Sequence, residues 1–303
     1  MQKAVITGPT GAIGLALIRK LKQEGVKVTA IVRPGSPRNA QVEKIPDVNL
    51  AICDLKDLSS FEAKGRADVF YHLGWCGTSG AARNDMSLQL QNVQYTLDAV
   101  SLAEKLGCKR FIGVGSQAEY GRTQALLSED TPCAPENGYG IAKLAAGQFS
   151  RLLSKELKME HVWTRVLSVY GPGDADHTLI ASLCKTLLSG EDFHCTKGEQ
   201  IWDYIYSADA AEFLYRLGTA KQADGGTFCI GSGRPTELKD YMELAREAVF
   251  EQKGSAGRLI LDRPYPEGQV MHLAADISKL TEVTGYRPET DFATGIREYL
   301  KSL

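Results

Sequence analysis

Three glycines near the N-terminus constrain what this chain can fold into. Gly8, Gly11 and Gly14 lie in the stretch TGPTGAIG, between an apolar run at 3–7 and a helical pattern that ends at Gly25. Glycine permits a tight turn and a close approach of the backbone to a ligand. The start of a helix presents unpaired N–H groups to an anion such as a pyrophosphate. A strand, a glycine-rich loop and a helix in this order predict a dinucleotide-binding unit.

The alternation of apolar runs with helical patterns continues through the first half of the chain. Strands are expected at 3–7, 26–32, 48–53, 68–74, 110–115 and 161–169, and long helices at 84–106 and 139–158. Because the strands are continuously apolar, this pattern predicts an α/β fold with a doubly wound parallel sheet that is covered on both faces.

The pattern changes after residue 170. Helical patterns at 177–190, 207–218, 236–251 and 291–302 then surround one short strand pattern at 227–231. We therefore predict a dinucleotide-binding Rossmann domain at 1–169 and a smaller, α-rich substrate domain at 170–303. We also allow for a return of the chain to the first domain around 201–219.

Composition excludes several classes of protein. The 303 residues are 43% hydrophobic and 24% charged, with a formal net charge of −2, which gives no reason to expect nucleic acid or a membrane surface as partner. We see neither a signal peptide nor an apolar run long enough to cross a membrane. The seven cysteines and five histidines form no C-x-x-C or H-x-x-x-H pair, so we predict free thiols, no metal site and a cytoplasmic location.

The residue after the second strand bears on which dinucleotide is bound. Sites that prefer NAD usually place an acidic residue there, which accepts hydrogen bonds from the ribose. This chain has Arg33 in IVRPGS and no carboxylate nearby. A guanidinium can pair with a 2′-phosphate, so Arg33 favours NADP, with NAD as the alternative. A solvated surface arginine is the other interpretation.

The spacing between tyrosine and lysine residues indicates which hydroxyl group transfers a proton in the reaction. A phenol has a pKa near 10 and needs a neighbouring cation to act near neutral pH. Of the twelve tyrosines, only Tyr139 has a lysine four residues on, Lys143, on the same helical face. Tyr120 has Gln124 there. Ser116 follows the fifth strand, at the carboxyl end of the sheet where ligands of such folds bind, and we expect it to hydrogen-bond the same substrate oxygen as Tyr139.

Together these motifs resemble the extended short-chain dehydrogenases/reductases, in the NAD-dependent epimerase/dehydratase branch that acts on nucleotide sugars. The resemblance covers nearly the whole chain and follows the family order through TGPTGAIG, CDLKD, YHLGW, NVQYTLDAV, GSQAEYG, YGIAK and RVLSVYGPGD. It implies that Ser116, Tyr139 and Lys143 are catalytic and that the C-terminal domain holds a nucleotide-diphosphate sugar. It also implies a homodimer that pairs the helices at 84–106 and 139–158.

The resemblance further implies which residues line the dinucleotide. In addition to Arg33, Tyr139 and Lys143, these are Gly8, Thr10, Gly11, Ala12, Ile13, Gly14, Asp54, Leu55, Leu73, Gly74, Trp75 and Asn92.

Departures from the family pattern narrow the reaction. Gln117 and Ala118 stand where dehydratases of the family carry an Asp-Glu pair, and neither can act as an acid or a base. Ala118 also replaces the cysteine of relatives that epimerise C3 or C5. Glu119 lies one position further, and alternation along an extended segment would turn it away from the substrate, so we interpret it as structural or solvated.

Of the reactions of this family, those that need only hydride transfer and a Ser–Tyr–Lys proton relay remain compatible with the sequence. Because Arg33 favours NADP, the leading hypothesis is an NADPH-dependent reductase of a nucleotide-linked 4-keto-6-deoxy sugar. The alternatives are an NAD-dependent 4-epimerase with a transient ketone and a non-catalytic dinucleotide-binding sensor or scaffold. Retention of both Tyr139 and Lys143 speaks against the last.

Six residues are candidates for contact with substrate: Thr78, Arg83, Gln117, His177, Trp202 and Arg263. Arg263 resembles an arginine of the family that binds the diphosphate. Trp202 replaces a second such arginine, and for it we prefer interdomain packing. Thr78 and Arg83 could equally well lie on a mobile loop without contacting substrate. For His177 a capping or packing role is the preferred interpretation.

Overall fold

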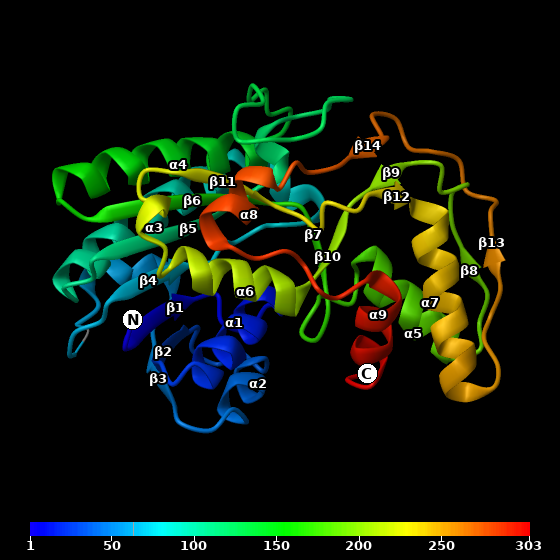
Figure 1. Ribbon diagram of the computed structural model, residues 1–303, viewed down its shortest axis with the longest axis horizontal. Helices are drawn as coiled ribbons and strands as arrows, with labels where there is room; N and C mark the ends of the chain where they lie inside the picture. The colour runs from blue at the N-terminus through cyan, green and yellow to red at the C-terminus, as the bar shows by residue number, and fades with distance from the viewer. Residues whose placement is uncertain (63) are drawn as a thin grey trace.

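A seven-stranded parallel sheet forms the centre of the larger part of the molecule. The computed structural model describes residues 1–62 and 64–303 (Figure 1). The strand order is β11-β6-β5-β4-β1-β2-β3. The strands are β1 (Lys3–Thr7), β2 (Lys27–Val32), β3 (Val48–Ile52), β4 (Val69–His72), β5 (Arg110–Ser116), β6 (Glu160–Val166) and β11 (Thr227–Ile230). The predicted α/β fold with a doubly wound sheet is confirmed.

Helices cover both faces of this sheet. One face packs against α1 (Ala12–Gln23), α6 (Ser207–Leu217) and α8 (Ser278–Thr284). The other packs against α3 (Met86–Lys105), α4 (Gly138–Glu156) and the 3-10 helix η1 (Leu55–Ser60). Alternate residues of each strand enter the two cores, which is why the strand sequences are apolar throughout.

The direction of winding reverses between β1 and β4. From β1 the chain proceeds to β2 and β3 on one side, and from β4 to β5 and β6 on the other. Ligands of open α/β sheets bind beyond the carboxyl ends of the strands at such a reversal. The loops after these two strands therefore frame the site described below.

A second, smaller part contains three helices with a core of its own. These are α5 (Leu179–Leu188), α7 (Leu238–Lys253) and α9 (Phe292–Leu300). Short strands join them to the rest: β7 (Ser168–Tyr170) pairs with β10 (Tyr204–Tyr206), β9 (Ile201–Trp202) lies between β12 (Thr236–Glu237) and β14 (His272–Leu273), and β8 (Phe193–His194) pairs with β13 (Leu259–Ile260). This part lies at the right of Figure 1.

Two elements that we expected in the second domain lie on the central sheet instead. The segment predicted as a strand at 227–231 forms β11, which pairs with β6 as the edge strand. The helix predicted at 207–218 is α6, which packs against α1. About sixty residues separate β11 from β6 in the sequence. A short apolar run does not reveal which strand it pairs with. A domain boundary at residue 170 remains a prediction.

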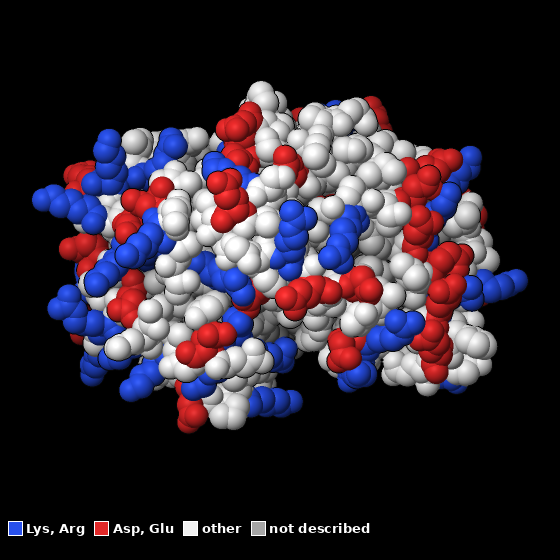
Figure 2. Space-filling view, viewed as in Figure 1, with Lys and Arg blue, Asp and Glu red and all other residues white. Residues whose placement is uncertain are grey.

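Other short elements were not predicted: α2 (Asn39–Glu43) and the 3-10 helices η2 (Gly80–Asn84), η3 (Gln117–Glu119) and η4 (Lys221–Ala223). Within the described residues, no helix is both long and apolar enough to cross a membrane. On the face shown in Figure 2, basic and acidic side chains are interspersed over both parts of the molecule.

Candidate active site

The glycine loop connects β1 to α1 and packs against the chain that follows β4. Gly8 has a φ of +68°, and a Cβ on it would lie 2.7 Å from the backbone nitrogen of Gly74. A Cβ on Gly14 would lie 2.4 Å from the carbonyl oxygen of Gly8. Both positions therefore require glycine for the fold itself. Around Gly11 the nearest such neighbour is 3.9 Å away, so no protein atom explains the glycine there.

That open space lies at the start of α1. Gly11 is the N-cap residue of this helix and provides no capping side chain, and the first turn contains no acidic residue. The N–H groups of the first turn are thus available to an anion, and Gly11 leaves room for it to approach. Thr10, Gly11, Ala12 and Ile13 are all partly exposed at this edge. The loop fits the pyrophosphate of a dinucleotide.

A buried histidine fixes the end of β4. The Nδ1 atom of His72 lies 2.8 Å from Thr7 Oγ1, and its Nε2 atom lies 3.3 Å from Thr96 Oγ1. Burial lowers the pKa of His72 to about 3, so the ring is neutral. The backbone N–H of Gly74 donates to Thr7 Oγ1 at 3.2 Å, which ties the chain after β4 to β1.

Asn92 supports this loop and uses both of its amide N–H groups to do so. Its Oδ1 accepts from the Cys76 N–H at 2.8 Å, and its Nδ2 donates to the carbonyls of Cys76 and Leu88. Only 1% of Asn92 is exposed. Asn92 thus supports the loop that carries Leu73, Gly74 and Trp75, and its predicted contact with the dinucleotide stays a prediction.

The other end of the predicted dinucleotide site combines Asp54, Leu55 and Arg33. Asp54 caps η1 by accepting from the Lys56 N–H at 3.3 Å. Leu55 packs closely against Gly74, whose Cβ would lie 2.9 Å from Leu55 Cδ2. Arg33 follows β2 and is exposed. Arg33 thus follows the carboxyl end of β2, and Asp54 and Leu55 follow that of β3.

Sequence reasoning missed Arg38 on the loop after β2. Its Nη2 donates to the carbonyl oxygen of Thr10 at 2.8 Å and to that of Gly173 at 2.5 Å. Arg38 thus places a second guanidinium beside the glycine loop and links that loop to the segment after β7. The only signal in the sequence is a second arginine five residues after Arg33.

Ser116, Tyr139 and Lys143 come together at the carboxyl end of β5. Ser116 is the last residue of that strand, and Tyr139 and Lys143 lie one helical turn apart at the start of α4. Ser116 is 8% exposed, Tyr139 9% and Lys143 3%. Asn137 caps α4 by accepting from the Gly140 N–H at 2.9 Å, which fixes where the helix begins.

Tyr139 lies between aromatic and cationic groups. The Arg83 guanidinium carbon is 4.3 Å from the centroid of the phenol ring, and the Trp75 ring meets it edge-on at 6.0 Å. Burial raises the pKa of Tyr139, while the Ser116 hydroxyl and Arg83 oppose that rise. A phenol in this state is protonated at neutral pH and can serve as an acid.

Lys143 was expected to be the cation that acts on the phenol of Tyr139, and its position differs from that expectation. Its Nζ donates to the Val114 carbonyl at 2.6 Å and lies 3.9 Å from the Trp75 ring centroid, but 5.9 Å from that of Tyr139. Burial lowers the pKa of Lys143 to about 7. Arg83, which sequence reasoning placed against the substrate, is therefore the cation that opposes the rise in the pKa of Tyr139.

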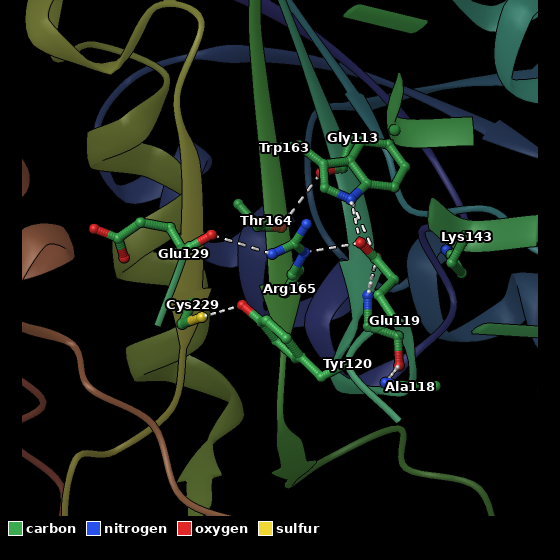
Figure 3. Close-up of polar contacts among 12 residues, drawn as sticks. Gly113, Ala118, Glu119, Tyr120, Glu129, Lys143, Trp163, Thr164, Arg165 and Cys229 are labelled. Atoms are coloured by element: carbon green, nitrogen blue, oxygen red, sulfur yellow. Dashed lines mark hydrogen bonds and ion pairs between the residues drawn. The ribbon is translucent and has the colours of Figure 1, made fainter. Parts of the chain in front are cut away.

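The second tyrosine of the motif region has a structural environment. Tyr120 is 2% exposed, and its hydroxyl donates to the Ser128 carbonyl and contacts Cys229 Sγ, each at 2.7 Å. It faces β11, on the side away from Lys143 (Figure 3). Gln117 is half-buried on η3, and Ala118 is buried.

The remaining substrate candidates are divided between the two parts of the molecule. Thr78 is exposed and accepts through its carbonyl from Arg83 Nη1 at 3.0 Å, which places both beside Tyr139. His177 and Arg263 are exposed on the second part. The residue that caps α5 is Thr178, so a capping role for His177 is wrong.

Trp202 is held by packing contacts. Its Nε1 donates to Ser168 Oγ at 2.8 Å, and its ring lies between two clusters of apolar side chains, one around α7 and one around Tyr120. This is the environment that the packing interpretation predicts.

Comparisons with known proteins agree with this geometry. A model of the NAD dependent epimerase/dehydratase family matches residues 4–231. A dTDP-glucose 4,6-dehydratase of Neisseria gonorrhoeae is 25% identical over 97% of this chain and 93% of that protein. A dTDP-6-deoxy-L-talose 4-dehydrogenase (NAD(+)) of Aggregatibacter actinomycetemcomitans is 26% identical over 79% of this chain and 87% of that protein.

Among solved structures, the UDP-glucose 4-epimerase of Thermotoga maritima has a TM-score of 0.84 with 21% identity, over 99% of this chain and 98% of that one. At this identity the likeness shows the fold, whereas the family model, which matches most of the chain, shows the family. The resemblance inferred from the motifs is therefore confirmed, and the chain belongs to the NAD-dependent epimerase/dehydratase family of enzymes.

Proposed function

We propose that this enzyme transfers a hydride at C4 of a nucleotide-linked sugar, and that it works as an NADPH-dependent reductase of a 4-keto-6-deoxy sugar. The site itself supports this reaction. Ser116, Tyr139 and Lys143 are buried at the carboxyl end of β5, while Ala118 offers no group for elimination or for proton abstraction from carbon. The talose 4-dehydrogenase among the relatives acts on a 6-deoxy sugar, as its name states.

The chemistry of reduction uses the residues as follows. A bound nicotinamide supplies the hydride that adds to the C4 carbonyl carbon. The carbonyl oxygen then needs one proton, which the protonated phenol of Tyr139 donates. Ser116 hydrogen-bonds the same oxygen and orients it. The phenolate that remains regains a proton from solvent, so the reaction consumes one hydride and one proton.

Two guanidinium groups support the choice of NADPH. Arg33 is exposed after β2, and Arg38 lies on the same loop, bound to the carbonyl of Thr10. A 2′-phosphate at this end of the dinucleotide would lie within a cationic loop. A UDP-glucuronic acid 4-epimerase of Bacillus cereus with the same fold was solved with NAD, which supports a nicotinamide dinucleotide.

Arg33→Ser tests this choice. We expect the variant to bind NADPH about 10–100-fold more weakly and NADH with unchanged affinity, because only NADPH has the phosphate that the guanidinium pairs with. Fluorescence titration of both cofactors measures the ratio. Arg287→Ser, at another exposed arginine, is the matched control. An unchanged ratio in Arg33→Ser would contradict the role of Arg33.

The reaction is tested on the purified enzyme. The dinucleotide released on denaturation is identified, and NADPH oxidation is followed with nucleotide-linked 4-keto-6-deoxy sugars. We expect an exchangeable site and turnover of at least one keto sugar. A second candidate, an NAD-dependent 4-epimerase, is supported by the UDP-sugar 4-epimerases that share the fold. Tightly retained NAD with epimerisation of a UDP-sugar would replace the reductase proposal.

We also propose that two copies of the chain pair through α3 and α4. These helices pack together and carry large apolar side chains that are more than half exposed: Met86, Leu90, Ile141, Phe149 and Leu152. We expect a homodimer by light scattering, and a monomer of about half that mass for Leu90→Glu combined with Phe149→Glu. Ile52→Glu, at an equally exposed isoleucine on β3, is the control. A monomeric wild-type protein would refute this pairing.

A further inference from the structure

A buried carboxylate lies directly behind Ser116. Glu119, on η3, has an exposed fraction of 0%. Its Oε1 accepts from the backbone N–H of Ser116 at 2.8 Å and from Trp163 Nε1 at 3.1 Å, and its Oε2 accepts from Arg165 Nε at 2.9 Å. Figure 3 shows the carboxylate between the indole and the guanidinium.

The surrounding backbone is shaped to admit this carboxylate. A Cβ on Gly115 would lie 2.2 Å from Glu119 Oε1, so no other residue fits beside it. A Cβ on Gly113 would lie 2.2 Å from the Trp163 ring, and one on Gly147 would lie 2.7 Å from it. Glycines on β5 and α4 thus make room for the acid and for the indole that donates to it.

Arg165 anchors the other side of the carboxylate. It lies on β6, is 6% exposed, and its guanidinium carbon is 4.7 Å from the Tyr120 ring centroid. Its Nη1 donates to the Glu129 carbonyl at 3.5 Å. A buried ion pair is often no more stabilising than apolar residues of the same volume. Stability alone therefore does not account for the Glu119–Arg165 pair.

The orientation of Ser116 follows from two hydrogen bonds. Glu119 holds its peptide N–H, and the Ala118 N–H donates to its Oγ at 3.2 Å. Because the Oγ accepts that bond, its own O–H proton stays available for donation toward the substrate. Geometry of this kind matters, since a misplacement of about 1 Å can cost about 100-fold in rate.

We propose that Glu119 is a positioning residue for Ser116: its carboxylate, held by Arg165 and Trp163, fixes the serine that orients the substrate oxygen. This role rests on the proposed function, in which Ser116 contacts that oxygen. Because Glu119 is fully buried, we expect it to touch neither substrate nor dinucleotide.

Two double variants isolate the contact. Glu119→Gln with Arg165→Met keeps an oxygen that can accept from the Ser116 N–H, and Glu119→Leu with Arg165→Met removes it, while both eliminate the ion pair. We expect the glutamine variant to keep kcat within about threefold of wild type and the leucine variant to lose about 30–100-fold in kcat, with KM and NADPH affinity little changed in both. Equal kcat values in the two variants would overturn the proposal.

A second readout does not depend on the substrate. Hydrogen exchange at the Ser116 amide, followed by NMR, is expected to be at least about tenfold faster in the leucine variant than in the glutamine variant. If the wild type reduces no 4-keto sugar, the proposed function fails, and the exchange rates still decide whether Glu119 fixes Ser116. Equal exchange rates would overturn the positioning role.

Two further variants complete the design. Trp163→Phe removes one donor to the carboxylate but leaves the Ser116 contact, so we expect kcat within about threefold of wild type. A loss as large as that of the leucine variant would contradict the proposal. If the leucine variant does not fold, Glu119→Met with Arg165→Met replaces it, because methionine adapts to the same volume and its thioether is only a weak acceptor for this N–H.

Discussion

Tyr139→Phe is expected to lower kcat by about 10²–10⁴-fold while the affinity for the dinucleotide stays within about threefold. The variant loses only the phenol O–H that donates the proton to the developing alkoxide. Its ring keeps the edge-on contact with Trp75 and the contact with Arg83, so the surrounding site is retained. Steady-state rates with the keto sugar and a titration with NADPH measure the two effects separately.

Tyr120→Phe is the matched control. This substitution also removes one hydroxyl from a buried tyrosine, but that hydroxyl is bound to the Ser128 carbonyl and Cys229 Sγ, away from the triad. We expect a decrease of about 1–2 kcal/mol in the free energy of unfolding and a kcat within about threefold of wild type. If Tyr120→Phe loses as much kcat as Tyr139→Phe, the assignment of the proton donor is wrong.

Local sequence signals predicted much of this site. The strand, glycine loop and helix around Gly11 are contiguous in the chain, and the Tyr139–Lys143 pair needs only the periodicity of one helix. The serine at the end of β5 was predicted because Ser116 directly follows an apolar run at 110–115. Each of these features depends on short stretches whose geometry the backbone determines by itself.

Features that depend on tertiary contacts could not be predicted in the same way. Arg83 reaches Tyr139 because η2 packs on the start of α4, where the Gly138 N–H donates to Asn84 Oδ1 at 2.9 Å. Asn92 turned out to hold the Cys76 backbone, a contact that no spacing in the sequence reveals.

Glu119 shows that strand alternation predicts the direction of a side chain only within the strand. Alternation of side chains was applied beyond the end of β5, and it left a solvated role open for this residue. The chain instead turns into η3 directly after Ser116, so the carboxylate folds back onto the serine N–H and is fully buried. A strand periodicity is valid only as far as the strand extends, and β5 ends at Ser116.

Lys143→Met is expected to raise the free energy of unfolding by about 1–3 kcal/mol at pH 7. Burial lowers the pKa of Lys143 to about 7, from 10.5 in an exposed lysine, so the fold bears the cost of a buried ammonium. The hydrogen bond to the Val114 carbonyl and the contact with Trp75 offset only part of that cost. Methionine fills a similar volume without the charge.

The dependence on pH distinguishes this cause from better packing. Between pH 7 and about 10 the unfolded wild type binds more protons at this lysine than the folded one, so wild-type stability from this group rises with pH. The advantage of Lys143→Met should therefore be largest at or below pH 7 and shrink at pH 9.5, as measured by urea unfolding without added dinucleotide. Lys155→Met, at an exposed lysine on the same helix, should show no such trend. An advantage that stays constant with pH would mean that packing, and not the buried charge, limits the stability of this site, and the lysine would then be held for catalysis at no electrostatic cost.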